Sequence, residues 1–191
     1  MLLMPTLFLV RHASPDWTRK DIPYHIPPGP PLSAQGLAEA QQAAEFLRLY
    51  GVKQVYTSPL ERCHHTAQIA AALAGVAPEV LDGLREWQPH ESHEAVIARI
   101  GPVVDRFRHA LHHGVAGPIA LFTHGGPIRA ALQHLGIDDA TMETLRIYDH
   151  LNPVPPAGIW QIQTDSPAAP PELKLVFIPP TAELFDGVWK V

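Results

Sequence analysis

Residues 7–14 constrain the fold of this chain more than any other stretch. Residues 7–10 are four apolar residues typical of a buried β-strand, and they run directly into Arg11 and His12, where the strand pattern stops. In an open α/β sheet, ligands bind outside the carboxyl ends of the strands. A strand that ends in Arg-His therefore predicts a polar site at one edge of such a sheet.

Size and charge exclude several classes of protein. The chain has 191 residues, the size of one domain with a sizeable core, so we expect a single domain over residues 1–191. A net charge of -5 gives no basis for binding nucleic acid or a membrane surface. The apolar first ten residues lack a basic region and are far shorter than the ~20 residues of a membrane span. We therefore expect a soluble, cytoplasmic protein.

Cysteine and histidine usage gives little support to a metal site. Cys63 is the only cysteine, which excludes an internal disulfide and a cysteine-rich zinc site. It is interpreted as a small packed residue rather than as a nucleophile. His90 and His93 are a weak candidate pair of metal ligands because no cysteine or helical ligand motif accompanies them. No metal and no cofactor is therefore expected.

Strand patterns alternate with helix patterns along the chain. Ser58 to Glu61 has the spacing of a capping box, which predicts that a helix begins at Ser58. The predicted helices cover residues 34–50, 58–73 and 93–113, and a fourth one ends at residue 135. The predicted strands cover residues 7–10, 52–57, 118–122, 159–163 and 173–178, with a less decisive one near 80–81. This alternation favours an α/β fold with a mostly parallel sheet and helices on both faces.

Residues 15–31 form a connection much longer than the usual ~4–6 residues. Long loops in compact domains are often functional, so this loop is a candidate lid over the substrate. Its side chains that either select the substrate or pack the lid are Asp16, Trp17, Arg19, Tyr24 and His25.

The carboxyl ends of parallel strands meet at one edge of a sheet. The polar residues that follow the predicted strands, and should therefore be neighbours, are Arg11, His12, Arg62 and His124. They would form a cationic pocket in an acidic protein, and the planar guanidinium group matches phosphate oxygens. A phosphoryl group is the natural ligand of such a pocket.

These residues also suggest roles in phosphoryl transfer. A neutral imidazole is a nucleophile, and His12 is the better candidate because it lies beside Arg11. The two arginines and a protonated His124 would compensate the charge on the phosphoryl oxygens. The leaving oxygen needs a proton, for which we assign Glu86, in a segment that could shield it from water. The same carboxylate would then act as base toward water.

Four motifs in a fixed order carry a resemblance to a known family. They are LVRHA at 9–13, TSPLER at 57–62 with TA at 66–67, LRE at 84–86 and THGG at 123–126. They resemble the motifs of the histidine phosphatase superfamily, also called the phosphoglycerate mutase-like family. The resemblance implies a three-layer α/β/α sandwich without a metal, in which His12 is phosphorylated in turnover. It also implies that Arg11, Arg62 and His124 complete the phosphate pocket and that an acidic residue donates the proton.

The chain departs from the pattern of this family in several places. Ala13 stands where the family usually has glycine, as it also does in a branch resembling small phosphohistidine phosphatases, and Trp17 stands in place of an asparagine. The Gly-Trp-Glu-Gly run that usually follows Glu86 is absent, which leaves Glu91 and Glu94 as alternative proton donors. The insertion of the glycolytic mutases is also missing, so hydrolysis is expected rather than mutase activity.

The sequence thus predicts a metal-independent phosphomonoesterase that acts through a phosphohistidine on His12. Its substrate would be a small phosphate ester or a phosphopeptide. A phosphomutase of the same family, which would require a bisphosphate, is one alternative. A catalytically silent module that binds a phospho-ligand or a protein is another. The substrate's identity and the oligomeric state are not predicted, because the long loop and the C-terminal segment carry no readable motif.

Overall fold

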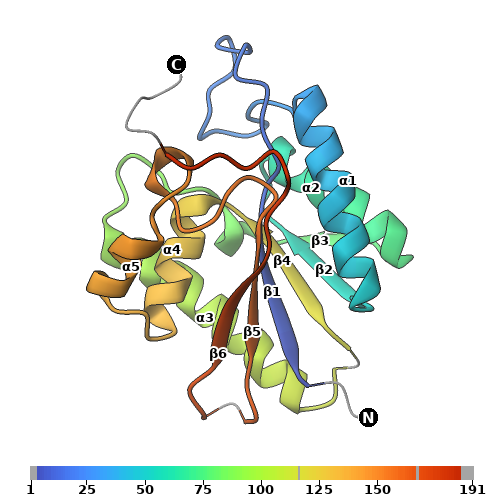
Figure 1. The fold of residues 1–191 in the computed structure, drawn as a ribbon, viewed down its shortest axis with the longest axis vertical. Helices are drawn as coiled ribbons and strands as arrows, with labels where there is room; N and C mark the ends of the chain where they lie inside the picture. The colour runs from blue at the N-terminus through green and yellow to red at the C-terminus, as the bar shows by residue number, and fades with distance from the viewer. Residues whose placement is uncertain (1–3, 116, 167, 186–191) are drawn as a thin grey trace.

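The computed structural model describes residues 4–115, 117–166 and 168–185. Six strands form one sheet in the order β3-β2-β4-β1-β5-β6 (Figure 1). The strands are β1 (Thr6–Arg11), β2 (Gln54–Thr57), β3 (Pro78–Val80), β4 (Ile119–Thr123), β5 (Ile159–Gln163) and β6 (Glu172–Phe177). The helices are α1 (Ala34–Leu49), α2 (Glu61–Ala74), α3 (His93–His112), α4 (Gly125–His134) and α5 (Asp139–Leu145), and two 3₁₀ turns are η1 (Asp82–Leu84) and η2 (Asp149–Leu151).

The sheet is mostly parallel, as predicted, but β5 runs in the opposite direction to the other five strands. Strands β1 to β4 pair in parallel, whereas β5 runs antiparallel to both β1 and β6. The reason lies in the connection that precedes β5. Ala157 donates to the carbonyl of His12, and Gly158 accepts from Arg11 N, so the chain is already at the C-terminal edge of β1. From that edge, β5 has to run back in the opposite direction.

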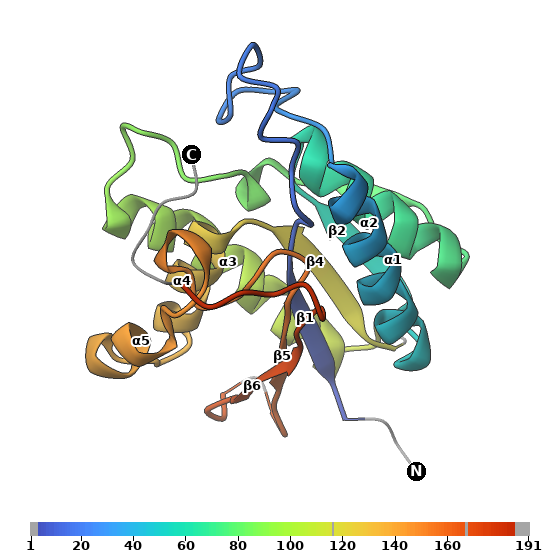
Figure 2. The same cartoon turned by 45° about the horizontal axis from the view of Figure 1, so that its top comes forward.

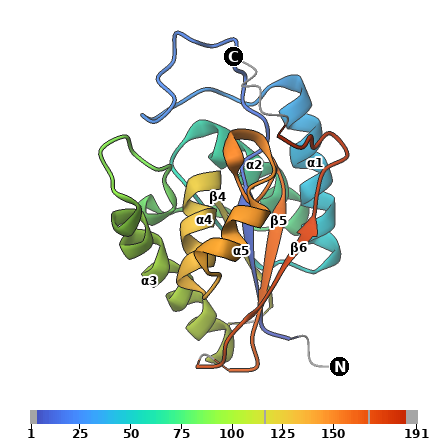
Figure 3. The same ribbon diagram turned by 60° about the vertical axis from the view of Figure 1, so that its left-hand side comes forward.

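Helices cover both faces of the sheet (Figure 3). Phe8 and Val10 of β1 pack in the core formed with α1 and α2. Leu7 and Leu9 of the same strand pack in the core formed with α3 and α4. All six residues of β1 and all five of β4 are buried, which explains why these strands appear in the sequence as continuous apolar runs rather than as alternating patterns.

Helix α2 begins three residues later than predicted, at Glu61 rather than at Ser58. The N–H of Ser58 donates to the Phe122 carbonyl of β4, so Ser58 extends the pairing of β2 with β4 and is not helical. The residue that precedes the helix is Leu60, and no side chain caps it. The serine hydroxyl of the expected capping box is used elsewhere, beside His124.

The loop over residues 15–31 arches beyond the C-terminal end of β1 (Figure 2). Its two ends are joined, because Asp16 N donates to the Pro31 carbonyl at 2.8 Å. Its far side is tied to the start of α2, where Glu61 N donates to the Pro28 carbonyl at 2.7 Å. The loop therefore lies over the edge at which the sequence predicts a site.

Among the described residues, no helix is both long enough and apolar enough to cross a membrane.

Helix α1 fixes the backbone that follows His12. Ser33 N donates to the Ser14 carbonyl at 3.0 Å, and Ser14 N donates to Glu39 of the same helix at 2.8 Å. The helix backbone approaches so closely at Gly36 that a Cβ there would lie 2.0 Å from the Ser14 carbonyl oxygen. Only glycine leaves this approach undisturbed.

We expect Gly36→Ala to lower the free energy of unfolding by about 1–3 kcal/mol, because the new methyl group has to push the Ser14 backbone away. Replacing glycine by alanine inside a helix normally raises the free energy of unfolding. Urea unfolding checks this, with Gln42→Ala on the exposed face of α1 as a control that stays within about 0.5 kcal/mol. An unchanged or raised midpoint for Gly36→Ala would contradict the close approach.

Candidate active site

The buried guanidinium group of Arg62 is the centre of the candidate site. Its Nε donates to His12 Nε2 at 3.3 Å. Its Nη2 lies 3.3 Å from both Glu86 Oε2 and His124 Nδ1. The arginine and His124 are fully buried, and His12 is 1% exposed. One charged group therefore contacts three other polar side chains away from water.

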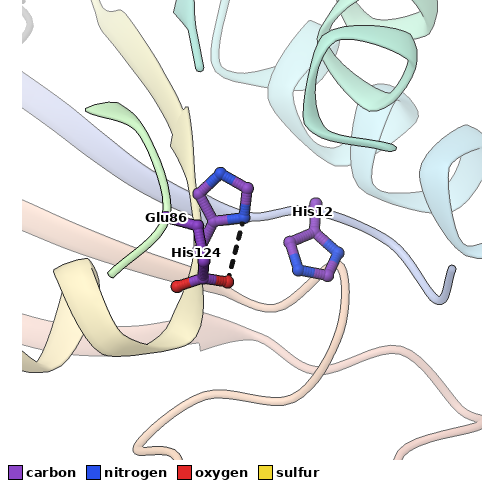
Figure 4. A group of neighbouring side chains, drawn as sticks. All are labelled: His12, Glu86 and His124. Carbon is purple, nitrogen blue, oxygen red and sulfur yellow. Dashed lines mark ion pairs between the residues drawn. The ribbon is translucent and has the colours of Figure 1, made fainter. Parts of the chain in front are cut away.

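These side chains come from three strand ends, as the sequence predicts. His12 follows β1, His124 follows β4, and Arg62 lies in the first turn of α2, just after β2. The rings of His12 and His124 have their centroids 5.1 Å apart, and the Glu86 carboxylate lies beside His124 (Figure 4). The expectation that the three strand ends converge is confirmed.

The ring of His12 is held in one orientation. Its Nδ1 lies 2.8 Å from the Ala13 carbonyl oxygen, which can only accept, so Nδ1 carries the hydrogen. The lone pair is then on Nε2, where Arg62 donates. Burial, followed by the charges of Arg62 and Arg11, lowers the pKa of His12 well below its usual 6.5. The imidazole is therefore neutral, with its lone pair on the Arg62 side.

His124 contacts a residue whose role the sequence does not indicate. Its Nε2 lies 2.8 Å from the hydroxyl of Ser58, which also accepts from Leu60 N. Burial, and then the charge of Arg62, lowers the pKa of His124 well below 6.5. With these neighbours alone the ring is neutral, in contrast to the protonated form that we expected. Ser58 was missed because its position also fitted a helix cap.

Arg11 is held by a carboxylate from the far end of the chain. Its Nη1 and Nη2 bind Asp149 at 2.6 and 2.9 Å, across 138 residues of sequence, and Nη1 also donates to the Val154 carbonyl. Burial opposes the charge of Arg11, but Asp149 raises its pKa above the usual value. Its Nε is buried and has no hydrogen-bond partner among the described residues. Nothing in the sequence marks Asp149 as a partner.

Of the three carboxylates considered as proton donors, the structure brings Glu86 to the site. Its Oε1 accepts from Trp87 N at 2.9 Å. Glu91 is bound instead by Arg99 and Arg85. Glu94 is exposed in the first turn of α3. Neither alternative is placed to replace Glu86.

A pocket of about 630 Å³ opens beside these residues. It is lined by Arg11, Trp17, Tyr24, His25, Glu86, Trp87, Gln88, Pro89, Gly125, Gly126, His150 and Asn152. The ring of Tyr24 covers the Arg62 guanidinium, with 3.8 Å from Cζ to the ring centroid, and its hydroxyl lies 3.5 Å from His12 Nε2. Tyr24 thus separates the buried histidine from the pocket mouth.

The long loop contributes three of its five candidate residues to the pocket. Trp17, Tyr24 and His25 line it. Asp16 and Arg19 do not, because their side chains are used within the loop. Asp16 accepts from Thr18, and Arg19 pairs with Asp21 on the surface.

Among the described residues, one group has metal-ligand geometry, with donor atoms of His12, Glu86 and His124 within 4.8 Å of one another. The Arg62 guanidinium contacts all three of these side chains. A fixed positive charge at this position disfavours a divalent cation and favours an anion. Among the residues that the structure describes, neither His90 nor His93 belongs to a group with metal-ligand geometry.

Fold and site together define an α/β protein with a buried cluster of arginine, histidine and glutamate side chains at the C-terminal edge of its sheet. Comparison with known families agrees. The family model of the histidine phosphatase superfamily (branch 1) matches residues 7–90 and 87–153, which is most of the chain. The chain therefore belongs to the histidine phosphatase superfamily, whose members are phosphatases or mutases.

A curated relative is a mutase. A 2,3-bisphosphoglycerate-dependent phosphoglycerate mutase from Clavibacter michiganensis is 37% identical over 90 residues, which cover 46% of this chain and 35% of that protein. The chain thus matches about a third of the length of this curated relative.

Solved structures share the fold. A mycobacterial glucosyl-3-phosphoglycerate phosphatase has a TM-score of 0.71 at 22% identity and covers 90% of this chain and 97% of its own. An Entamoeba histolytica phosphoserine phosphatase has a TM-score of 0.69 at 16% identity and covers 88% and 94%. At these identities the likeness concerns the fold.

We expect the protein to lose stability as the pH falls below about 6.5. Both His12 and His124 have a lowered pKa in the folded protein, so below this pH the unfolded chain binds protons that the folded protein does not. The contribution of the two rings to the free energy of unfolding is complete above pH 6.5. Below this pH it declines by up to ~1.4 kcal/mol per pH unit for each ring. Urea unfolding between pH 7.5 and 5 measures it. The slope of the free energy of unfolding against pH reports how many more protons the unfolded chain binds. In His12→Asn this number should be smaller by about one, and a slope identical to that of the wild type would contradict a buried neutral ring.

Proposed function

We propose that this protein hydrolyses phosphate monoesters through a covalent phosphohistidine on His12. One observation carries the proposal. The Nδ1–H of His12 is engaged by the Ala13 carbonyl, so the lone pair is on Nε2, which accepts from the buried guanidinium of Arg62 at 3.3 Å. A neutral, oriented imidazole beside a fixed positive charge is suited to attack a phosphoryl group.

Several donors support binding of a phosphoryl group at this position. Arg62 offers its charge, and Arg11 has a buried Nε without a partner among the described residues. Leaving such a donor unpaired costs about 1–3 kcal/mol, which a bound anion would recover. Gly125 and Gly126, in the first turn of α4, line the pocket, and the amides at a helix N-terminus favour negative charge.

The reaction proceeds in two steps. In the first, His12 Nε2 attacks phosphorus, a P–N bond forms, and the ester P–O bond breaks on the opposite side. Glu86, which carries a proton once the anionic substrate is bound, gives that proton to the departing alcohol oxygen. In the second, water attacks the phosphohistidine while the Glu86 carboxylate takes a proton from that water, and the P–N bond breaks to release phosphate. The negative phosphoryl group favours protonation of His124, which then donates to a phosphoryl oxygen.

The charges of the pocket favour hydrolysis over mutase activity. Among the described lining residues, the formally charged side chains are Arg11 and Glu86. Arg11 is paired with Asp149, and its remaining donor is assigned to the transferred phosphoryl group, so the described lining offers no further arginine or lysine for the other phosphate of a bisphosphate. The mutase relative makes phosphomutase the second candidate. A phosphatase works without a bisphosphate, whereas turnover of a phosphoglycerate only after priming with 2,3-bisphosphoglycerate would identify a mutase.

Replacing His12 tests the nucleophile. We expect His12→Ala to lower kcat for 4-nitrophenyl phosphate by at least ~10³-fold, with a chelator present throughout, because no other group can form the covalent intermediate. His109→Ala, on the exposed surface of α3, is the control and should retain wild-type activity. Undiminished turnover by His12→Ala would refute the proposal.

Leaving-group dependence tests Glu86. An alkyl phosphate needs a proton on its leaving oxygen and a nitrophenyl phosphate does not. We therefore expect Glu86→Gln to reduce kcat about 10²–10⁴-fold for the first ester and much less for the second. Glu94→Gln is the matched control and should behave as wild type. If Glu91→Gln or Glu94→Gln showed the selective loss instead, the proton donor would be misassigned.

A further inference from the structure

The walls of the pocket are aromatic, although its floor is charged. Trp17, Tyr24, Trp87 and His150 all line it, and they come from three separate segments. Convergence of flat rings from distant parts of the chain is not required by the phosphoryl chemistry, which uses the strand ends. These walls would therefore surround the alcohol portion of the substrate.

One wall is a stack that extends toward solvent. The rings of Trp17 and Tyr24 have centroids 5.0 Å apart and an angle of 11° between their planes. Trp17 remains 51% exposed. A tryptophan that is stacked on one ring and still half exposed offers apolar, flat surface to a ligand at the pocket mouth.

The part of the wall formed by Trp87 is rigid. The indole Nε1 of Trp87 donates to the Glu91 carbonyl at 2.9 Å, and Arg99 holds the Glu91 carboxylate. The ring also packs against the backbone of Gly126, where a Cβ would lie 3.0 Å from it. A wall fixed in this way is preorganised for a ligand and loses little freedom on binding.

His150 is the fourth aromatic residue of the walls, and its backbone is strained. Its φ of 51° is in the left-handed region, which is uncommon for residues other than glycine and is associated with ligand sites. Its ring lies 5.7 Å from that of Trp17. Burial lowers the pKa of His150, so this ring adds no positive charge to the walls at neutral pH. These four side chains thus present flat rings without a fixed charge to the pocket.

We infer that the substrate is a phosphate monoester of an uncharged alcohol that carries a flat aromatic ring, which lies against the exposed indole of Trp17 at the pocket mouth. The inference rests on the proposed phosphatase function and adds the class of substrate. A carboxylate or a second phosphate on the same substrate would enter the walls without a cation to pair with, at a substantial loss of binding. An aromatic ring would gain stacking on the half-exposed indole of Trp17.

Three esters of alcohols with similar acidity separate ring recognition from leaving-group chemistry. They are benzyl phosphate, cyclohexylmethyl phosphate and 4-carboxybenzyl phosphate. We expect kcat/KM for the benzyl ester to exceed that for the cyclohexylmethyl ester by about tenfold, because only the first has a flat ring. The 4-carboxybenzyl ester should be at least about tenfold poorer than the benzyl ester.

Two variants of Trp17 test whether this residue causes the preference for the benzyl ester. Trp17→Leu should bring the ratio of benzyl to cyclohexylmethyl ester close to one, and Trp17→Phe, which keeps a flat ring, should retain most of it. Equal use of the three esters by the wild-type protein, or an unchanged ratio in Trp17→Leu, would overturn the inference while leaving His12-dependent hydrolysis intact.

Binding of non-hydrolysable analogues provides a readout that does not need turnover. Calorimetry with benzylphosphonate and cyclohexylmethylphosphonate should show the same preference for the aromatic compound, again lost in Trp17→Leu. If no ester is hydrolysed in a His12-dependent manner, the proposed function fails. If hydrolysis occurs and the two phosphonates bind equally, only the substrate class fails.

Discussion

The buried charge of Arg62 is the interaction on which the candidate site depends. A guanidinium group taken out of water is strongly destabilising unless it is paired and hydrogen-bonded. Glu86 supplies the opposite charge, and the Tyr24 carbonyl accepts from Nη1 at 2.9 Å. His12 and His124 use the remaining contacts. The same group thus joins two strand ends, the long loop and the segment before α3. Burial, and then the charge of this group, lowers the pKa of both imidazoles.

A second arginine holds the segment that carries Glu86. Arg99 of α3 donates to the carbonyls of Gly83 and Arg85 and binds the Glu91 carboxylate. This arrangement explains why Glu91, an alternative proton donor from sequence alone, has a structural role. Its charge balances two arginines, and its backbone carbonyl anchors Trp87. The position of Glu86 beside Arg62 follows from these anchors.

Residues near strand ends were predictable from sequence, whereas contacts between distant segments were not. His12 and His124 follow continuous apolar runs, and the geometry of a parallel sheet brings such ends together. Asp149 lies 138 residues from Arg11 in a 3₁₀ turn that has no periodic pattern. Ser58 was misassigned because a capping box and an extended residue before Pro59 have the same sequence. The antiparallel course of β5 depends on where the preceding chain lies, which local patterns do not encode.

The most direct test of this account identifies the phosphorylated atom. The Glu86→Gln variant, which should release the phosphoryl group slowly, would be mixed with a phosphate ester and quenched in alkali, where phosphohistidine survives. Peptide mass spectrometry and ³¹P NMR then locate the label. Because Nδ1 of His12 is bound to the Ala13 carbonyl, we predict phosphorylation of His12 at Nε2. A label on Nδ1 or on another residue, or no label while the ester is turned over, would contradict the account.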